Sequence, residues 1–147
     1  MSNRWVGWSV VASLVLASGG RGDEAGAAAA LKKLGARVTI DERAPGKPVV
    51  AVTFTDVTEA GLQQLKELKS LKTLDLSNTK APDAALKELR GLRSLQSLNL
   101  TATAVTDAGM EDLKDLKKLK TLTLGFTKVT AAGFKELKEA LPKCEIR

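Results

Sequence analysis

Four copies of one 24-residue pattern fill most of the chain, and no insertion separates them. The copies begin at Val50, Leu74, Leu98 and Leu122, where each opens with two apolar residues on either side of a third residue. A period of about 20 to 29 residues with such an opening is typical of stacked strand-and-helix units. One unit cannot cover its own apolar flanks, so each must pack on the next. The spacing therefore predicts an α/β solenoid built from such stacked strand-and-helix units.

Two apolar periodicities recur within each copy. In the second copy Leu74 and Leu76 are two residues apart, so both side chains leave a strand on the same side. Leu86, Leu89 and Leu92 are three residues apart and lie along one side of a helix. The strand and the helix each present one apolar face, and we expect these faces to meet in a common core.

Signals for a helix start follow each strand. A threonine there can accept a hydrogen bond from a free backbone N–H, and an acidic residue after it suits the positive end of the helix dipole. The threonines are Thr58, Thr106 and Thr130, with Pro82 in the second copy, and the acidic residues are Glu59, Asp83 and Asp107. A small residue comes next, at Gly61, Ala85, Gly109 and Gly133. We expect neighbouring backbones to approach closely at this position.

Residues 1–20 have the features of a secretory signal peptide. Arg4 gives a positive start, an apolar run follows at 6–17, and small residues end the segment. The run has 12 residues, whereas a membrane-spanning helix needs about 20. We expect cleavage near Ala17 and export to the periplasm, the cell envelope or the medium. If the segment stays uncleaved, it anchors the protein in the inner membrane through residues 6–17.

Residues 21–48 join this segment to the repeats. We interpret 21–26 as a loop, 27–34 as a helix, 38–40 as a short strand and 41–48 as a turn, which together form a linker and an N-terminal cap. The repeat domain then covers 49–147, with copies at 50–73, 74–97, 98–121 and 122–145 and a C-terminal cap. Ile146 is expected in a truncated fifth strand. Cys144 is expected to be a buried cap residue, with a reactive thiol or an intermolecular disulfide as alternatives.

The composition argues against catalysis. The chain has no histidine, so its hydroxyls and its one thiol lack the commonest activating base. No carboxylate cluster has metal-ligand spacing, and no glycine-rich phosphate loop is present, so we predict neither enzyme activity nor a cofactor or metal. The net charge is +6, but opposite charges alternate along the helices as on a solvated face. Aromatic residues do not interleave with the basic ones, so we predict no nucleic-acid partner.

The segment Leu100-Thr-Ala-Thr-Ala-Val-Thr-Asp-Ala-Gly-Met110, followed by three regularly spaced leucines, resembles a bacterial leucine-rich repeat. It is most similar to the variety abundant in exported proteins of planctomycete-like bacteria, which has threonine where many members have asparagine. Those threonines are Thr55, Thr79, Thr103 and Thr127. The resemblance covers about 38–147 and implies a right-handed short horseshoe with parallel strands on the concave face and helices on the convex face. It also implies a threonine ladder whose hydroxyls bond to the backbone and tie the loops together.

Strand residues that alternate with the buried leucines must face outward. The candidate ligand-binding residues on this face are Thr53, Phe54, Asp75, Ser77, Asn78, Asn99, Thr101, Thr123 and Phe126. They are small and polar at the centre, with one phenylalanine near each end. The two phenylalanines either anchor a partner or pack on the cap and on the C-terminal tail. The polar residues either bind a ligand or form ordinary surface.

The sequence favours a non-enzymatic interaction module that acts outside the cytoplasm through its concave strand face. Its partner would be a protein or a cell-envelope polymer, and a membrane only if the N-terminal segment remains uncleaved. A structural envelope component that uses the convex helices is the alternative, as is an adaptor-type repeat subunit of a larger complex.

Overall fold

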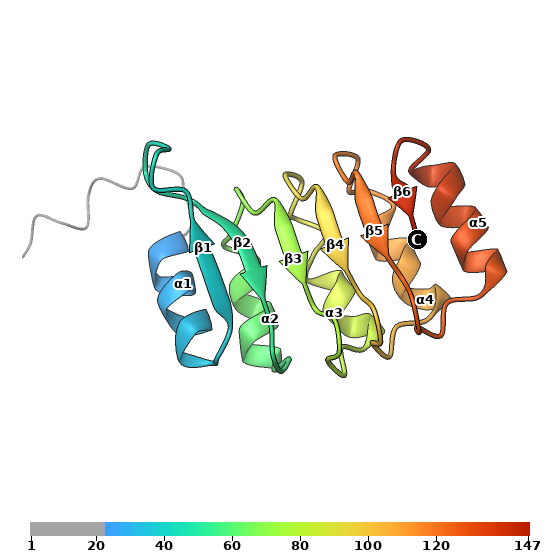
Figure 1. Ribbon diagram of the computed structural model, residues 1–147, viewed down its shortest axis with the longest axis horizontal. Coiled ribbons are helices and arrows are strands. Elements are labelled where there is room, and N and C mark those ends of the chain that lie inside the picture. The colour runs from blue at the N-terminus through green and yellow to red at the C-terminus, as the bar shows by residue number, and fades with distance from the viewer. Residues whose placement is uncertain (1–22) are drawn as a thin grey trace, which may run out of the picture.

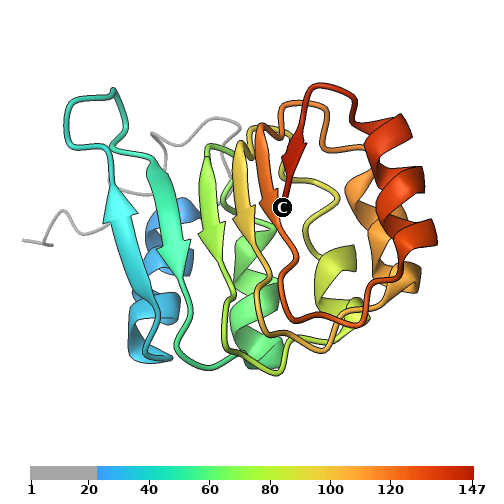
Figure 2. The same ribbon diagram turned by 45° about the vertical axis from the view of Figure 1, so that its right-hand side comes forward.

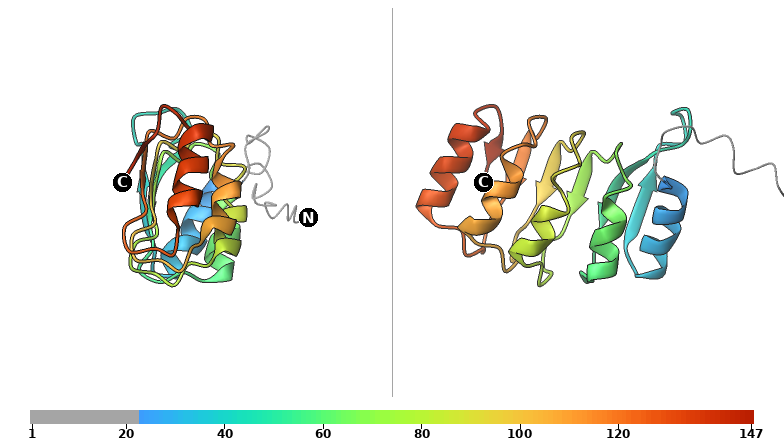
Figure 3. Two further views of the ribbon diagram at one scale, coloured as in Figure 1. Left: turned by 90° about the vertical axis from the view of Figure 1, so that its right-hand side faces the viewer. Right: turned by 180° about the vertical axis from the view of Figure 1, so that it is seen from behind.

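The computed structural model describes residues 23–147, which form one six-stranded sheet in the order β1 to β6 with the helices on one side of it (Figure 1). Seen along the stack, strands and helices form two separate layers (Figure 3). The strands are β1 (Arg37–Ile40), β2 (Val49–Thr53), β3 (Thr73–Asp75), β4 (Ser97–Asn99), β5 (Thr121–Thr123) and β6 (Glu145–Ile146). The helices are α1 (Glu24–Lys33), α2 (Glu59–Leu65), α3 (Asp83–Lys87), α4 (Asp107–Met110), the 3-10 helix η1 (Glu111–Leu113) and α5 (Ala131–Ala140).

Parallel pairing of the repeats is confirmed for β2 to β6, whereas the cap strand β1 pairs antiparallel with β2. Leu74 pairs with Leu98, Leu98 with Leu122 and Leu122 with Ile146, so each partner lies 24 residues further on. Ile146 therefore lies in a short fifth repeat strand, as its spacing predicts. Figure 2 shows the strands side by side with the helices stacked behind them.

The register of the first copy differs from the sequence prediction. Val52, rather than Val50, pairs with Leu74, a separation of 74 − 52 = 22 residues. The helix starts remain 24 apart, because α2 begins at Glu59 and α3 at Asp83. The loop between strand and helix is therefore two residues shorter in the first copy. The prediction of four uninterrupted 24-residue copies starting at Val50 is wrong here, since the shift buries Phe54 and leaves Val50 half-buried.

The core lies between the sheet and the helices. Leu74 of β3 and Leu76 directly after it are fully buried, as are Leu86 of α3 and, in the segment after that helix, Leu89 and Leu92, so the two apolar faces meet as expected. Each buried leucine contributes about 1.5–3 kcal/mol relative to an exposed one. The same positions are buried in the third copy, so one core continues along the stack.

The N-terminal cap starts earlier than the sequence predicts. The Asp23 carboxylate accepts a hydrogen bond of 3.0 Å from the Gly26 N–H, which starts α1 at Glu24. The assignment of 24–26 to a loop is therefore wrong, because an N-cap residue precedes the alanine run. Ala27, Ala28 and Leu31 are buried, so α1 covers the open side of the first repeat.

At the opposite end, Cys144 is buried and unpaired among the described residues. Burial raises the pKa of the Cys144 thiol and outweighs the opposing effect of the Lys138 ammonium, so the thiolate is disfavoured. Of the three expectations for this residue, the structure agrees with that of a buried cap residue.

The predicted signal peptide, residues 1–20, lies outside the described part of the chain. Over residues 23–147, none of the helices is long and apolar enough to cross a membrane.

Neighbouring repeats are joined at the helix starts by an aspartate and a threonine. The Asp83 carboxylate accepts hydrogen bonds from the N–H and the hydroxyl of Thr106, at 2.7 and 2.6 Å, and Asp107 is bonded in the same way to Thr130. The predicted hydroxyl cap is present at Thr58 and Thr106, but at Thr130 the hydroxyl serves Asp107 and caps none of the described N–H groups.

The small residues of the next position make room for these carboxylates. A Cβ atom added at Gly133 would lie 2.2 Å from Asp107 Oδ1, and one at Gly109 would lie 2.6 Å from Asp83 Oδ1. We had expected the neighbouring backbone to approach here. The group that lies close to Gly109 and Gly133 is instead an aspartate side chain of the preceding repeat.

The helix layer carries a second link between repeats. Lys66 pairs with Glu88, Arg90 with Asp112, and Lys114 with Glu136, and each partner is 22 residues further along the chain. Because the acidic partner always belongs to the next copy, these ion pairs connect neighbours along the whole stack. Each pair places a cation of one copy against a carboxylate of the next.

Candidate binding face

The outward residues of β2 to β5 define the strand face, and one row of them contains four of the predicted site residues. Backbone pairing places Thr53 beside Asp75, Asp75 beside Asn99, and Asn99 beside Thr123. All four are partly exposed. The 24-residue spacing alone would place Ala51 beside Asp75, but the two-residue shift of the first strand brings Thr53 to that position.

Asp75 and Asn99 also control how the chain leaves its strands. The Asp75 Oδ1 atom accepts a hydrogen bond of 2.9 Å from the Ser77 N–H. The Asn99 Oδ1 atom accepts the N–H and the hydroxyl of Thr101, at 3.1 and 2.7 Å. Such side-chain bonds to the N–H two residues ahead stabilise turns. Part of the polarity of this face therefore stabilises the turns. These bonds use only one oxygen of Asp75 and the amide oxygen of Asn99, so the second Asp75 oxygen and the Asn99 amide nitrogen can bond to a partner.

A tight turn with a left-handed residue follows three of the strands. The left-handed residues are Asn78, Ala102 and Phe126, with φ of 58°, 56° and 56°. The strands end at Asp75, Asn99 and Thr123, so four predicted face residues lie in these turns and not in the strands: Ser77, Asn78, Thr101 and Phe126. They form the rim of the strand face where the chain turns toward the helices.

Three of the four ladder threonines close these turns. The hydroxyls of Thr79, Thr103 and Thr127 donate to the carbonyls of the residues three positions earlier, at 2.6, 2.7 and 2.7 Å. Thr55 differs from the expectation: it is exposed, and its hydroxyl reaches the Gly35 carbonyl of the cap at 3.4 Å. The shortened first loop has no room for the turn that the other three threonines close.

The two phenylalanines of the candidate site have opposite environments. Phe54 is 3% exposed and takes the position of Leu76 in the core, with its ring against Gly61, so it does not belong to the binding face. Phe126 is 92% exposed. Its backbone is in the left-handed region, which is unusual for a bulky residue. The expected pair of aromatic anchors is therefore reduced to one.

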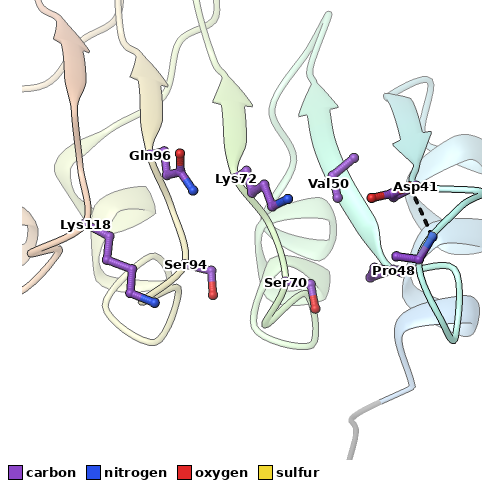
Figure 4. Close-up of a pocket in the computed structure, with 9 residues that line it drawn as sticks. Asp41, Pro48, Val50, Ser70, Lys72, Ser94, Gln96 and Lys118 are labelled. Carbon is purple, nitrogen blue, oxygen red and sulfur yellow. Dashed lines mark hydrogen bonds between the residues drawn. The ribbon is translucent and has the colours of Figure 1, made fainter.

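Sequence reasoning missed a polar depression at the other end of the strands (Figure 4). It has a volume of about 300 Å³, and its polar lining comes mainly from Ser70, Lys72, Ser94, Gln96 and Lys118, with Asp41 at the cap end. These residues stand at the same two positions of successive copies. Their 24-residue spacing is visible in the sequence, but the predicted site included only residues that alternate with the leucines and those just after the strands.

Within the part of the chain that the structure describes, no group of three or more His, Cys, Asp or Glu residues could hold a metal ion. The strand face and its rim present hydroxyl groups, amide groups, the carboxylate of Asp75 and the aromatic ring of Phe126. These groups can form hydrogen bonds and apolar contacts with a partner.

No family model and no curated protein matches the chain. A solved structure of a leucine-rich-repeat protein from Leptospira interrogans is similar to it, with 29% sequence identity and a TM-score of 0.50 over 65% of this chain. The chain spans 23% of the length of that protein. The crystal structure of PEPR1-AtPEP1 is similar at 20% identity and a TM-score of 0.43, over 69% of this chain and 18% of that one. The parallel sheet, its regular register and the similarity to the Leptospira structure support a leucine-rich-repeat fold for this chain.

Proposed function

We propose that the protein is a non-enzymatic binding module that holds another protein against its strand face. We take this face to be the concave side of a right-handed short horseshoe. Stacked repeats offer an extended surface whose outward side chains vary without disturbing the core. The leucine-rich-repeat fold and the absence of histidine from the sequence both support binding over catalysis.

Phe126 is the observation that carries this proposal. An aromatic ring that is 92% exposed loses the stabilisation of burial, and a left-handed backbone at a non-glycine residue costs roughly 1–2 kcal/mol more. The equivalent positions in the two preceding copies hold Asn78 and Ala102, neither of which exposes a large apolar group. Residues with a strained backbone concentrate at functional sites, and aromatic residues are enriched among those that contribute most to the binding energy of protein interfaces.

The polar row completes the proposed interface. Thr53, Asp75, Asn99 and Thr123 lie side by side on neighbouring strands. A partner that buries Phe126 at one end of the face can form hydrogen bonds with this row. Such an arrangement, with an aromatic anchor and polar contacts beside it, is typical of protein interfaces.

We propose further that the module acts outside the cytoplasm, in the periplasm, the envelope or the medium. The support is the signal-peptide pattern of residues 1–20, with Arg4, the apolar run and the small residues. The repeat pattern favours an exported bacterial protein of the planctomycete type.

Site-specific photocrosslinking in cells tests the proposed interface. A photoreactive phenylalanine analogue replaces Phe126 in one variant, and exposed Lys135 on the outer side of α5 in a matched control. A discrete protein adduct at position 126 that is absent at position 135 is expected. An adduct at position 135 alone would favour the alternative, in which the protein is a structural component of the envelope and makes its contacts through the helices. Equal labelling at both positions would contradict a specific strand-face interface.

A further inference from the structure

One edge of the sheet carries a periodic set of cations. The segments just before β3, β4 and β5 read Lys-Ser-Leu-Lys at 69–72, Arg-Ser-Leu-Gln at 93–96 and Lys-Lys-Leu-Lys at 117–120. Together they contain six basic residues and no acidic one. We call the polar residues of these segments on the strand side the basic strip: Ser70, Lys72, Ser94, Gln96, Lys118 and Lys120.

Backbone hydrogen bonds hold the strip together. The Gln96 N–H donates to the Lys72 carbonyl at 2.8 Å, and the Lys120 N–H donates to the Gln96 carbonyl at 2.8 Å. Lys72, Gln96 and Lys120 are thus consecutive across the sheet. Figure 4 shows the side chains of Lys72, Gln96 and Lys118 around one open depression, with the hydroxyls of Ser70 and Ser94 beside them.

The charges of the strip are not neutralised by the described part of the chain. Lys66, Arg90 and Lys114 all pair with acids in the helix layer, whereas Lys72 and Lys118 form no ion pair with any residue of 23–147. The same holds for Lys120 within that range.

One carboxylate lines the depression, at its cap end. The Asp41 Oδ1 atom already accepts hydrogen bonds from the N–H groups of Arg43 and Ala44, at 3.1 and 3.2 Å. Asp41 therefore stabilises the turn before β2, and the basic strip itself presents lysine ammonium groups, hydroxyls and one amide.

We propose that the basic strip binds a linear anionic polysaccharide of the carboxylated type, which lies across the strands. Neighbouring strands are about 4.8 Å apart, so Lys72 and Lys120, two strands apart, are separated by about 10 Å along the strip. Between them stand neutral donors and acceptors, Ser94 and Gln96. A polymer with carboxylates at regular intervals and hydroxyls between them matches this alternation of charge and neutral polarity.

Other polyanions fit the strip less well. Single-stranded nucleic acid is bound by aromatic side chains on which its bases stack, and none of the residues that line the depression is aromatic. A membrane surface would require basic residues on a protruding surface together with apolar groups that insert, whereas Lys72 and Lys118 line a recess. The proposal goes beyond the proposed protein-binding function and uses different residues, so either of the two can fail alone.

Binding of a fluorescein-labelled oligogalacturonate to the purified full chain tests the proposal by fluorescence anisotropy. The strip variant combines Lys72→Gln, Lys118→Gln and Lys120→Gln. The control variant combines Lys80→Gln, Lys87→Gln and Lys128→Gln, three exposed lysines away from the strip, and removes the same charge. A labelled neutral oligogalactose and a labelled oligo(dT) of equal charge serve as further probes.

We expect saturable binding of the oligogalacturonate that weakens with added salt, and a loss of about tenfold in affinity for the strip variant. The control variant should change the affinity by less than about twofold, and the neutral sugar should not bind. Equal losses in the two variants, or oligo(dT) binding as tight as that of the oligogalacturonate, would overturn the proposal. Circular dichroism spectra matching the parent chain establish that both variants are folded.

Discussion

The Asp107 carboxylate accepts two hydrogen bonds from Thr130, one from the backbone N–H at 2.7 Å and one from the hydroxyl. Thr130 lies 23 residues further along the chain, in the next copy. The same pair of bonds joins Asp83 to Thr106. The aspartate that the sequence assigned to the helix dipole therefore also connects one repeat to the next.

The hydrogen bonds between Asp107 and Thr130 are predicted to make the stability of the fold depend on pH. Hydrogen bonds from Thr130, first from its hydroxyl and then from its N–H, lower the pKa of the Asp107 carboxyl below the ordinary value of 3.8. A carboxyl with a depressed folded-state pKa stabilises the fold above its unfolded pKa, and this contribution is lost as pH falls through the folded pKa. We expect Asp107→Asn to have a lower urea midpoint than the parent at pH 7. The difference between the two midpoints should shrink below pH 3.8, where the parent carboxyl becomes protonated. Urea titrations at several pH values measure this, and a constant difference at all pH values would contradict it.

Gly133 is predicted to tolerate alanine only when Asp107 is removed. In a helix interior alanine is normally better than glycine by about 1 kcal/mol, but here its Cβ would lie 2.2 Å from Asp107 Oδ1. We expect Gly133→Ala to destabilise the parent by about 1–3 kcal/mol. In the Asp107→Ala background the same change should become neutral or stabilising.

A double-mutant cycle from denaturant unfolding measures this reversal of sign. Gly125→Ala is the matched control, since its Cβ would have an ordinary contact of 3.8 Å with Thr101. The same loss from Gly133→Ala in both backgrounds would show that the carboxylate is not the cause.

Phe126→Asn should separate binding from stability. Asparagine adopts the left-handed conformation more readily than phenylalanine, and Asn78 already occupies the equivalent turn with φ of 58°. We expect the substitution to raise the free energy of unfolding by up to about 1 kcal/mol while abolishing partner capture. A loss of both stability and capture would indicate that Phe126 supports the fold.

The ion pairs between helices should differ in strength because their acids differ in burial. Asp112 is 4% exposed, whereas the Glu88 side chain is 25% exposed. Arg90→Met leaves the Asp112 carboxylate buried without its cation, and we expect a loss of about 1–3 kcal/mol. Lys66→Met should cost about 1 kcal/mol or less. Chemical denaturation of both variants compares them, and equal losses would contradict a role for burial.

Cleavage of the predicted signal peptide has a simple optical test. Both tryptophans, Trp5 and Trp8, lie in this segment, and the chain has no tyrosine. The exported protein should therefore show almost no absorbance at 280 nm and no tryptophan fluorescence. Intact-mass measurement of the exported protein gives the cleavage position, and tryptophan emission from it would show that the segment is retained.

The sequence predicted the elements whose residues repeat with strong apolar periodicity. Leu74, Leu98 and Leu122 pair as their spacing required, because a shift by one residue would turn each leucine toward solvent. The register of the first strand was predicted wrongly. Val50 and Val52 continue the 24-residue pattern, yet Phe54 gains more from burial, and the shorter loop shifts the strand by two residues.

The binding face was harder to predict because its polar residues also have local partners. Asp75 and Asn99 were assigned to ligand binding, but each also bonds to the turn two residues ahead. The two phenylalanines differ only in the folded structure, where Phe54 is buried and Phe126 is exposed.

The ion pairs and the aspartate–threonine pairs link each copy to its immediate successor. If residues 98–121 were excised, Arg90 would face Glu136 and Asp83 would face Thr130, so every remaining joint would keep its chemistry. Gene duplication or loss of whole units could thus lengthen or shorten the molecule without the redesign of any boundary.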